Sequence, residues 1–109
     1  MLSDTDRQRV VASLLESHRT KIQGSRPSEM FPDIEIADSY AISSAVAQAR
    51  IAEGRSVVGH KIGLTSKAMQ ASSKIDEPDY GYIFDDLILQ DGARVAFSDF
   101  CVPRVEPEL

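Results

Sequence analysis

Residues Val57–Gly63 read VVGHKIG, and this short run decides how the rest of the chain is divided. It is rich in β-branched residues and is preceded and closed by glycines, at Gly54 and Gly63, which predicts a strand. Apolar residues before the run recur at helical spacing, whereas the residues after it carry further strand and turn signals. We therefore expect an α+β fold, with a helical region over residues 1–55 and the start of a β-rich region over residues 56–109.

Two helices are predicted ahead of this strand. The first begins at Ser3 or Asp4, either of which can cap a helix, and its apolar pattern continues to Gly24. An irregular, proline-containing connection is expected over residues 25–33. The second helix should cover about residues 37–53, because apolar residues line one face and a glycine follows where helices commonly end.

The remainder is predicted to be β-rich. Residues 81–89 are a second strand candidate with a break at Asp85-Asp86, and Asp91-Gly92 is a hairpin signal that points to a return strand over residues 94–97. A last extended segment is expected over residues 102–108, and its two prolines favour a sheet edge or a bulge.

Composition excludes several classes of protein. The chain has 109 residues, which suits one small domain, and its 12 Lys and Arg against 17 Asp and Glu give a formal charge of -5. This balance argues against a nucleic-acid partner. Cys101 is the single cysteine, so an internal disulfide is excluded. The first residues lack an export signal, and no apolar run reaches the roughly eighteen residues of a membrane span, so we expect a cytoplasmic protein without membrane contact.

Lys61 is a candidate catalytic residue. Strand alternation places it on the same face as Gly59 and Gly63, which have no side chains, so a ligand could approach there. A lysine partly shielded from water in such a space could exchange protons. The alternative is that Lys61 merely extends along a sheet edge into solvent. His60 falls on the opposite face, where a packed, hydrogen-bonded histidine is the expected role.

Two further segments contain candidate site residues. After Gly63, either Thr65 or Ser66 can cap a short helix, and N–H groups at such a start can bind a substrate carboxylate, although an ordinary cap is equally common. Glu77 and Asp79 flank a proline in a predicted turn. They are either solvated acids or a general acid or base near the Lys61 face.

Glu106 and Glu108 are candidate metal ligands. In an extended segment they point to the same side with Cα atoms roughly 6.5 Å apart, close enough to reach one ion. Oxygen ligands suit Mg²⁺ or Mn²⁺ rather than zinc. Two solvated glutamates on an edge strand are the alternative interpretation.

Three segments together resemble a known family. The runs Gly59–Gln70, Glu77–Gly81 and Pro103–Glu108, in this order, resemble the hydratase/decarboxylase branch of the fumarylacetoacetase superfamily. The resemblance covers essentially the whole chain. It implies that the β-rich region is the beginning of a mixed fumarylacetoacetase-like catalytic region, which is truncated here because most of that region lies beyond Leu109.

The resemblance also implies a chemistry. Members hold a divalent metal, usually Mg²⁺, and it would be bound here by Glu106, Glu108 and a third acidic residue further along the chain. They are homo-oligomers and act on small anionic 2-oxo or 2-hydroxy acids, such as the 2-oxo-hept-4-ene-1,7-dioate type of aromatic catabolism. Lys61 would handle the proton, with Asp79 or Glu77 as its partner. The substrate-binding residues would be Gly63, Leu64, Thr65 and Ser66.

Two functions follow from this resemblance, and a third is an alternative to it. The first is metal-dependent hydration of such an acid, by an enzyme of which the 109 residues alone would be inactive. The second is decarboxylation of a 2-oxo acid of the 4-oxalocrotonate type, on the same metal site. The third, from a different class, is a non-catalytic fragment that acts only in assembly.

Overall fold

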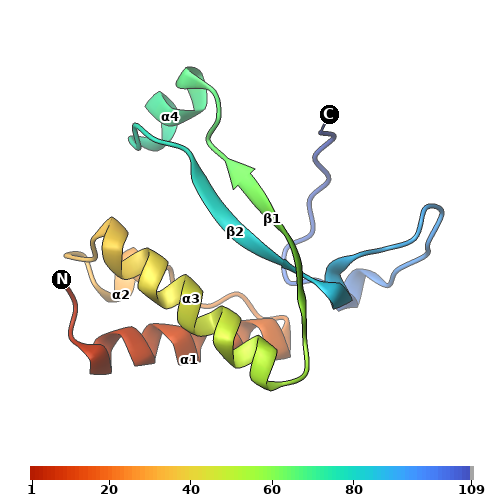
Figure 1. The fold of residues 1–109 in the computed structure, drawn as a ribbon, viewed down its shortest axis with the longest axis horizontal. Helices are drawn as coiled ribbons and strands as arrows, with labels where there is room; N and C mark the ends of the chain where they lie inside the picture. The colour runs from red at the N-terminus through yellow and green to blue at the C-terminus, as the bar shows by residue number, and fades with distance from the viewer. Residues whose placement is uncertain (109) are drawn as a thin grey trace. The chain divides into compact units, whose positions relative to one another are not determined.

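The computed structural model describes residues 1–108 and confirms an α+β fold. The larger elements are the helices α1 (Asp4–Thr20) and α3 (Ile36–Ala52) and the strands β1 (Val57–Gly63) and β2 (Asp79–Phe84) (Figure 1). Two short helices, α2 (Pro27–Met30) and α4 (Lys67–Ser73), lie in the connections, and two 3-10 turns follow β2, namely η1 (Asp85–Leu87) and η2 (Phe97–Asp99).

The chain forms two compact units. One contains Met1–Val46 together with the segment that starts at Asp91, and the other contains Ala47–Gln90. These boundaries cut through α3, whereas the predicted division at residues 55 and 56 follows the change from helix to strand. The predicted domain division stays a prediction.

The ends of α1 follow from local hydrogen bonds. The Ser3 hydroxyl accepts a bond of 3.1 Å from the N–H of Asp6, which caps the helix as predicted. The helix ends at Thr20 rather than near Gly24, because Lys21 turns into the left-handed region at φ 60° and its N–H bonds to the carbonyl of Ser17.

The first unit is held together by a small apolar core and a buried carboxylate. Val10 and Val11 of α1 pack against Ile42 of α3, and all three are buried. Asp38, in the first turn of α3, is fully buried and accepts a hydrogen bond from the N–H of Leu2 and one from Arg7. Burying three aliphatic side chains contributes roughly 1.5–3 kcal/mol each.

The second unit contains an antiparallel β-hairpin with α4 in its connection (Figure 1). β1 and β2 form a two-stranded sheet in which Lys61 pairs with Gly81 and Gly63 pairs with Asp79. Phe84 at the end of β2 is buried, and the guanidinium of Arg50 from α3 stacks over its ring at 5.3 Å.

Several predicted elements are corrected. Pro27–Met30 is a helical turn inside the predicted irregular connection, with Pro27 at the first helical position, which proline favours. The predicted strand over residues 81–89 is instead β2, which begins and ends earlier, and η1 starts at Asp85, where a break was predicted. Neither a return strand over residues 94–97 nor a strand over residues 102–108 forms among the residues described, although Asp91-Gly92 does make a turn.

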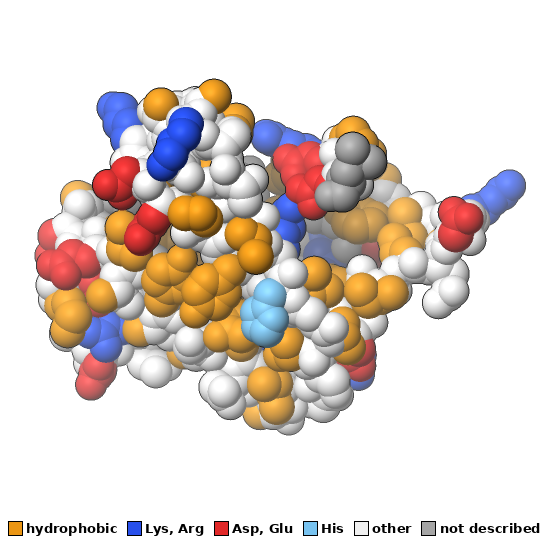
Figure 2. Space-filling view, turned by 45° about the horizontal axis from the view of Figure 1, so that its top comes forward, with side chains coloured by type: hydrophobic (Ala, Val, Ile, Leu, Met, Phe, Trp, Pro, Cys, Tyr) orange, Lys and Arg blue, Asp and Glu red, His pale blue; other side chains and the backbone are white. Residues whose placement is uncertain are grey.

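Many large hydrophobic side chains remain exposed. Figure 2 shows hydrophobic side chains exposed on the face in view. The most exposed of these residues include Ile62 at 63%, Phe97 at 80% and Val105 at 96%. Within residues 1–108, no helix is long and apolar enough to cross a membrane.

Candidate functional site

One face of the hairpin carries three glycines close to Lys61. Residues paired directly across an antiparallel sheet share a face, so Lys61 lies on the face of its partner Gly81 and of Gly59 and Gly63. A Cβ atom added at Gly81 would meet nothing within 4 Å. Lys61 is exposed on this face, which we call the bare face. The space beside it is open over Gly81, whereas Ile83 lies 4.0 Å from a Cβ placed at Gly59 and Asp79 occupies the position over Gly63.

Asp79 projects onto the same face. It pairs with Gly63, two residues along from the Lys61–Gly81 pair, so Lys61 and Asp79 are diagonal neighbours. Such neighbours have Cα atoms roughly 7–8 Å apart, which a lysine side chain can span. The Asp79 carboxylate lies against Gly63 so closely that a Cβ there would collide with Oδ1. The register therefore makes two predicted site residues diagonal neighbours, and a Cβ at position 63 would require the Asp79 side chain to move.

The opposite face of the hairpin is aromatic. His60 pairs with Tyr82, their ring centroids lie 5.3 Å apart, and Tyr80 adds a second ring 6.3 Å from His60. The rings meet at tilted or edge angles, as aromatic pairs prefer. His60 is on the face opposite Lys61, as predicted, but it is exposed rather than packed in a core, and Tyr80 is 50% exposed.

The turn after β1 has an unusual backbone. Leu64 lies in the left-handed region at φ 53°, which side-chain-bearing residues seldom adopt. Ser66, rather than Thr65, caps α4, and its hydroxyl accepts a hydrogen bond of 3.2 Å from the N–H of Met69. These residues follow the end of β1 and lead directly into α4, and the whole connection from residue 64 to residue 78 joins the two antiparallel strands.

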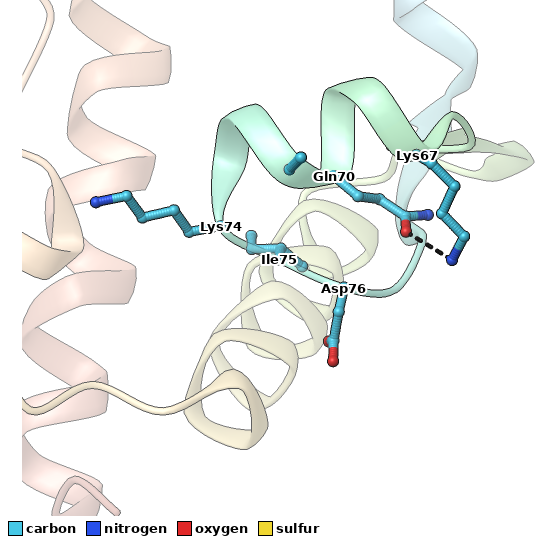
Figure 3. Close-up of a pocket in the computed structure, with 6 residues that line it drawn as sticks. Lys67, Gln70, Lys74, Ile75 and Asp76 are labelled. Carbon is cyan, nitrogen blue, oxygen red and sulfur yellow. Dashed lines mark hydrogen bonds between the residues drawn. The ribbon is translucent and has the colours of Figure 1, made fainter.

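A shallow pocket of about 500 Å³ lies against α4 and the residues that follow it. Figure 3 shows Gln70 beside Lys67, whose Nζ donates a hydrogen bond of 3.1 Å to the Gln70 side chain. Lys74, Ile75 and Asp76 complete the labelled lining, and Lys74 and Asp76 point away from that pair (Figure 3).

The remaining predicted residues lie in irregular segments. Glu77 is exposed in a bend two residues before β2 begins. Glu106 and Glu108 are exposed in the segment after η2, in the unit that does not contain Lys61. Their carboxylates are the oxygen donors that Mg²⁺ prefers. The described residues contain no group of three or more His, Cys, Asp or Glu that could hold a metal ion, so these two could be only part of a site.

Two buried charged residues, Asp38 and Arg50, were not predicted from the sequence patterns. Burial alone would raise the pKa of Asp38, but hydrogen bonds from the N–H groups of Glu35 and Leu2, and then from Arg7, outweigh it and hold the pKa below its usual range. Arg50 donates a hydrogen bond of 2.5 Å to Asp86 and thereby lowers the pKa of that carboxyl. The signal that could have revealed Asp38 is its place in the first turn of a helix, where an acid can bond back to the cap residue.

The chain is similar to several bacterial hydratases. It is 54% identical to 2-oxo-hept-4-ene-1,7-dioate hydratase from Escherichia coli over 79 residues. These aligned residues make up 72% of this chain and 30% of that enzyme. It is 46% identical over 81 residues to 2-keto-4-pentenoate hydratase from Paraburkholderia xenovorans, with 74% and 30% covered. No protein-family model matches the chain.

Solved structures agree on the fold. 4-Oxalocrotonate decarboxylase from Pseudomonas putida G7, complexed with calcium and acetate, matches with a TM-score of 0.76 at 24% identity, over 79% of this chain and 33% of that one. The same enzyme complexed with magnesium and adipate matches with a TM-score of 0.75. The chain thus spans about a third of the length of the proteins that it matches. Over these residues the chain belongs to the family that the two hydratases represent.

Proposed function

We propose that these residues are the amino-terminal part of a metal-dependent hydratase, which adds water to a 2-hydroxy-dienoate or 2-oxo-enoate acid of the 2-oxo-hept-4-ene-1,7-dioate type in aromatic catabolism. The observation that carries the proposal is the bare face on which Lys61 and Asp79 are neighbours. It is supported by the 54% identity to an Escherichia coli hydratase of that substrate name.

The chemistry requires a group that moves protons. Water adds to the dienol acid only after ketonisation, in which a proton leaves the 2-hydroxyl and another reaches the far carbon, so that the remaining double bond becomes electrophilic. Lys61 is suited to this proton transfer because it is exposed and because its cross-strand partner Gly81 adds no side chain to that face. Asp79 on the same face, or Glu77 just before β2, would stabilise the charged lysine or exchange the proton with it.

The substrate carboxylate is assigned to the turn after β1. Gly63, Leu64, Thr65 and Ser66 form this turn at the end of the bare face, where backbone groups can reach a small anion. The turn and the Lys61 face would then hold the two ends of one short acid.

A divalent metal completes the proposal, and Mg²⁺ is preferred to Mn²⁺. Glu106 and Glu108 would supply two of its ligands, with a third acidic residue outside these 109 residues. Bound there, the metal would supply Lewis-acid stabilisation of the negative charge on the substrate oxygen. We further propose a homo-oligomeric, cytoplasmic enzyme.

Decarboxylation is the second candidate function. It is favoured by the likeness in fold to 4-oxalocrotonate decarboxylase. The same proposed metal site would then stabilise the enolate that remains when carbon dioxide leaves. We prefer hydration because the hydratases are more similar in sequence, at 54% and 46% against 24%.

A chimera tests the proposal. Residues 1–109 would replace the matching part of the Escherichia coli hydratase, and purified protein would be incubated with the 2-hydroxy-dienoate and Mg²⁺. Formation of the 4-hydroxy-2-oxo acid, followed by loss of dienol absorbance and by mass spectrometry, is expected. Release of carbon dioxide instead would favour the decarboxylase. A folded chimera with neither activity would refute both and leave the non-catalytic assembly role.

A further inference from the structure

We propose that Gln70 is a positioning residue, which holds Leu64 in its left-handed conformation and thereby sets the shape of the turn over Gly63–Ser66. The juxtaposition that supports this is a buried side-chain amide of α4 bonded to the carbonyl of the one strained residue in that turn. The inference rests on the proposed function, in which this turn binds the substrate carboxylate.

Leu64 needs support from its surroundings. At φ 53° its Cβ is crowded by the backbone, so the conformation is unfavourable for a branched side chain and persists only where other contacts fix it. The local sequence offers no glycine at this position to remove the crowding. A contact from outside the turn is therefore required.

Gln70 supplies that contact. Its Nε2 donates a hydrogen bond of 2.8 Å to the carbonyl oxygen of Leu64, six residues earlier, while Lys67 donates to its Oε1. Only 6% of Gln70 is exposed, and a bond shielded from water is stronger than an exposed one. The Gln70 side-chain amide therefore donates one hydrogen bond and accepts another, and the residue that carries it is buried.

The backbone of Gln70 is fixed as well. Its N–H bonds to the carbonyl of Ser66 at 3.0 Å, and its carbonyl accepts from Ile75 at 3.1 Å, where Lys74 ends α4 in the left-handed region. Both ends of α4 are therefore anchored through this one residue, and its side chain has little freedom to leave Leu64. A mobile glutamine could not impose a backbone conformation; this one is held on both sides.

The test separates the two bonds of the amide. In the chimera, Gln70→Glu keeps the size and the acceptor for Lys67 but cannot donate to Leu64, and Lys67→Met removes only the other bond. We expect Gln70→Glu to lower kcat/KM about tenfold to a hundredfold, mainly through KM, because a misplaced turn binds the carboxylate poorly. Lys67→Met should change it less than about threefold.

A double-mutant cycle identifies the cause. Leu64→Gly removes the crowding, so in that background Gln70→Glu should cost less than about threefold in kcat/KM. An undiminished loss there would overturn the proposal, as would an equal loss in Lys67→Met or no loss in Gln70→Glu. A simple folding defect would not produce this coupling between positions 64 and 70.

An activity-independent readout covers the case of an inactive chimera. The three-bond couplings that report the φ angle of Leu64 would be measured by NMR in the 109-residue chain. A positive φ in the wild type and in Lys67→Met, lost in Gln70→Glu, supports the positioning role even where the proposed function fails. A positive φ that persists in folded Gln70→Glu overturns it.

Discussion

At the scale of single residues, Lys61 is the first position to test. Lys61→Met in the chimera should lower turnover by roughly a hundredfold or more, because it removes a proton-handling group. Metal affinity should stay nearly unchanged, because no proposed ligand is lost. Steady-state kinetics and Mg²⁺ calorimetry measure the two effects. Turnover equal to that of the unmodified chimera would assign Lys61 a structural role.

The contact between Gly63 and Asp79 can be tested with a variant at Gly63 and a control variant at Gly81. Gly63→Ala places a Cβ against Oδ1 of Asp79, which can swing away, whereas Gly81→Ala adds a methyl group to open space. Both variants should change the free energy of unfolding by less than about 1 kcal/mol. NMR couplings that report χ1 should show a new rotamer of Asp79 in Gly63→Ala alone. An unchanged rotamer would contradict the contact between residues 63 and 79.

Residue patterns predicted only part of the site. The spacing of Lys61 between glycines was visible in the sequence, because alternation along one strand needs no knowledge of a partner. The meeting of Lys61 with Asp79 depends on the register of β1 against β2, which the spacing alone did not specify. The role of Gln70 was not predicted, because glutamine in a short helix has no distinctive pattern and its bond to Leu64 spans six residues.

At the scale of elements, the packing of α1 against α3 depends on Ile42. Ile42→Ala should lower the free energy of unfolding by about 2–4 kcal/mol, since it leaves a cavity beside Val10 and Val11. Ile36→Ala on the same helix is the control, because Ile36 is 52% exposed, and it should cost less than about 1 kcal/mol. Urea unfolding followed by circular dichroism compares the two. Equal costs would show that the core does not lie at Ile42.

The bond between Arg50 and Asp86 ties α3 to the turn after β2 and should make stability depend on pH. The lowered pKa of Asp86 means that its contribution is fully present above the unfolded value of about 3.9 and is lost as pH falls through the folded value. Because the Asp86 side chain is 32% exposed, solvent screens the pair, and we expect only about 1 kcal/mol.

Asp86→Asn should therefore lower stability at pH 7, and its difference from the wild type should narrow as pH falls below the unfolded pKa of about 3.9. Glu53→Gln is the control, because Glu53 contacts the same guanidinium at 3.4 Å but is 60% exposed. Urea midpoints measured from pH 7 to pH 3 give the comparison. A constant gap between Asp86→Asn and wild type at every pH would contradict the assignment.

The helices and β1 were predicted well, and the later strands were not. A helix forms its hydrogen bonds within one segment, so the spacing of apolar residues located α1 and α3 within a few residues. A strand needs a partner, and in the described part of the chain residues 94–97 and 102–108 have none. The extended preference seen in their sequence was therefore insufficient to make a strand.

At the scale of the whole molecule, the number of metal ligands limits what these residues can do. Mg²⁺ prefers about six oxygens in octahedral geometry and releases its waters reluctantly. Glu106 and Glu108 would supply two carboxylates from an exposed, irregular segment, so binding would also have to order that segment.

We expect the 109-residue chain to bind Mg²⁺ with a Kd of roughly 1 mM or weaker. The chimera, with a third acidic ligand present, should bind far more tightly and should lose that affinity on Glu106→Ala. Isothermal titration calorimetry of both proteins measures the difference. Tight binding by the 109-residue chain alone, abolished by Glu106→Ala, would mean that these residues already contain a complete site, and the assignment of the third ligand to another part of the enzyme would be wrong.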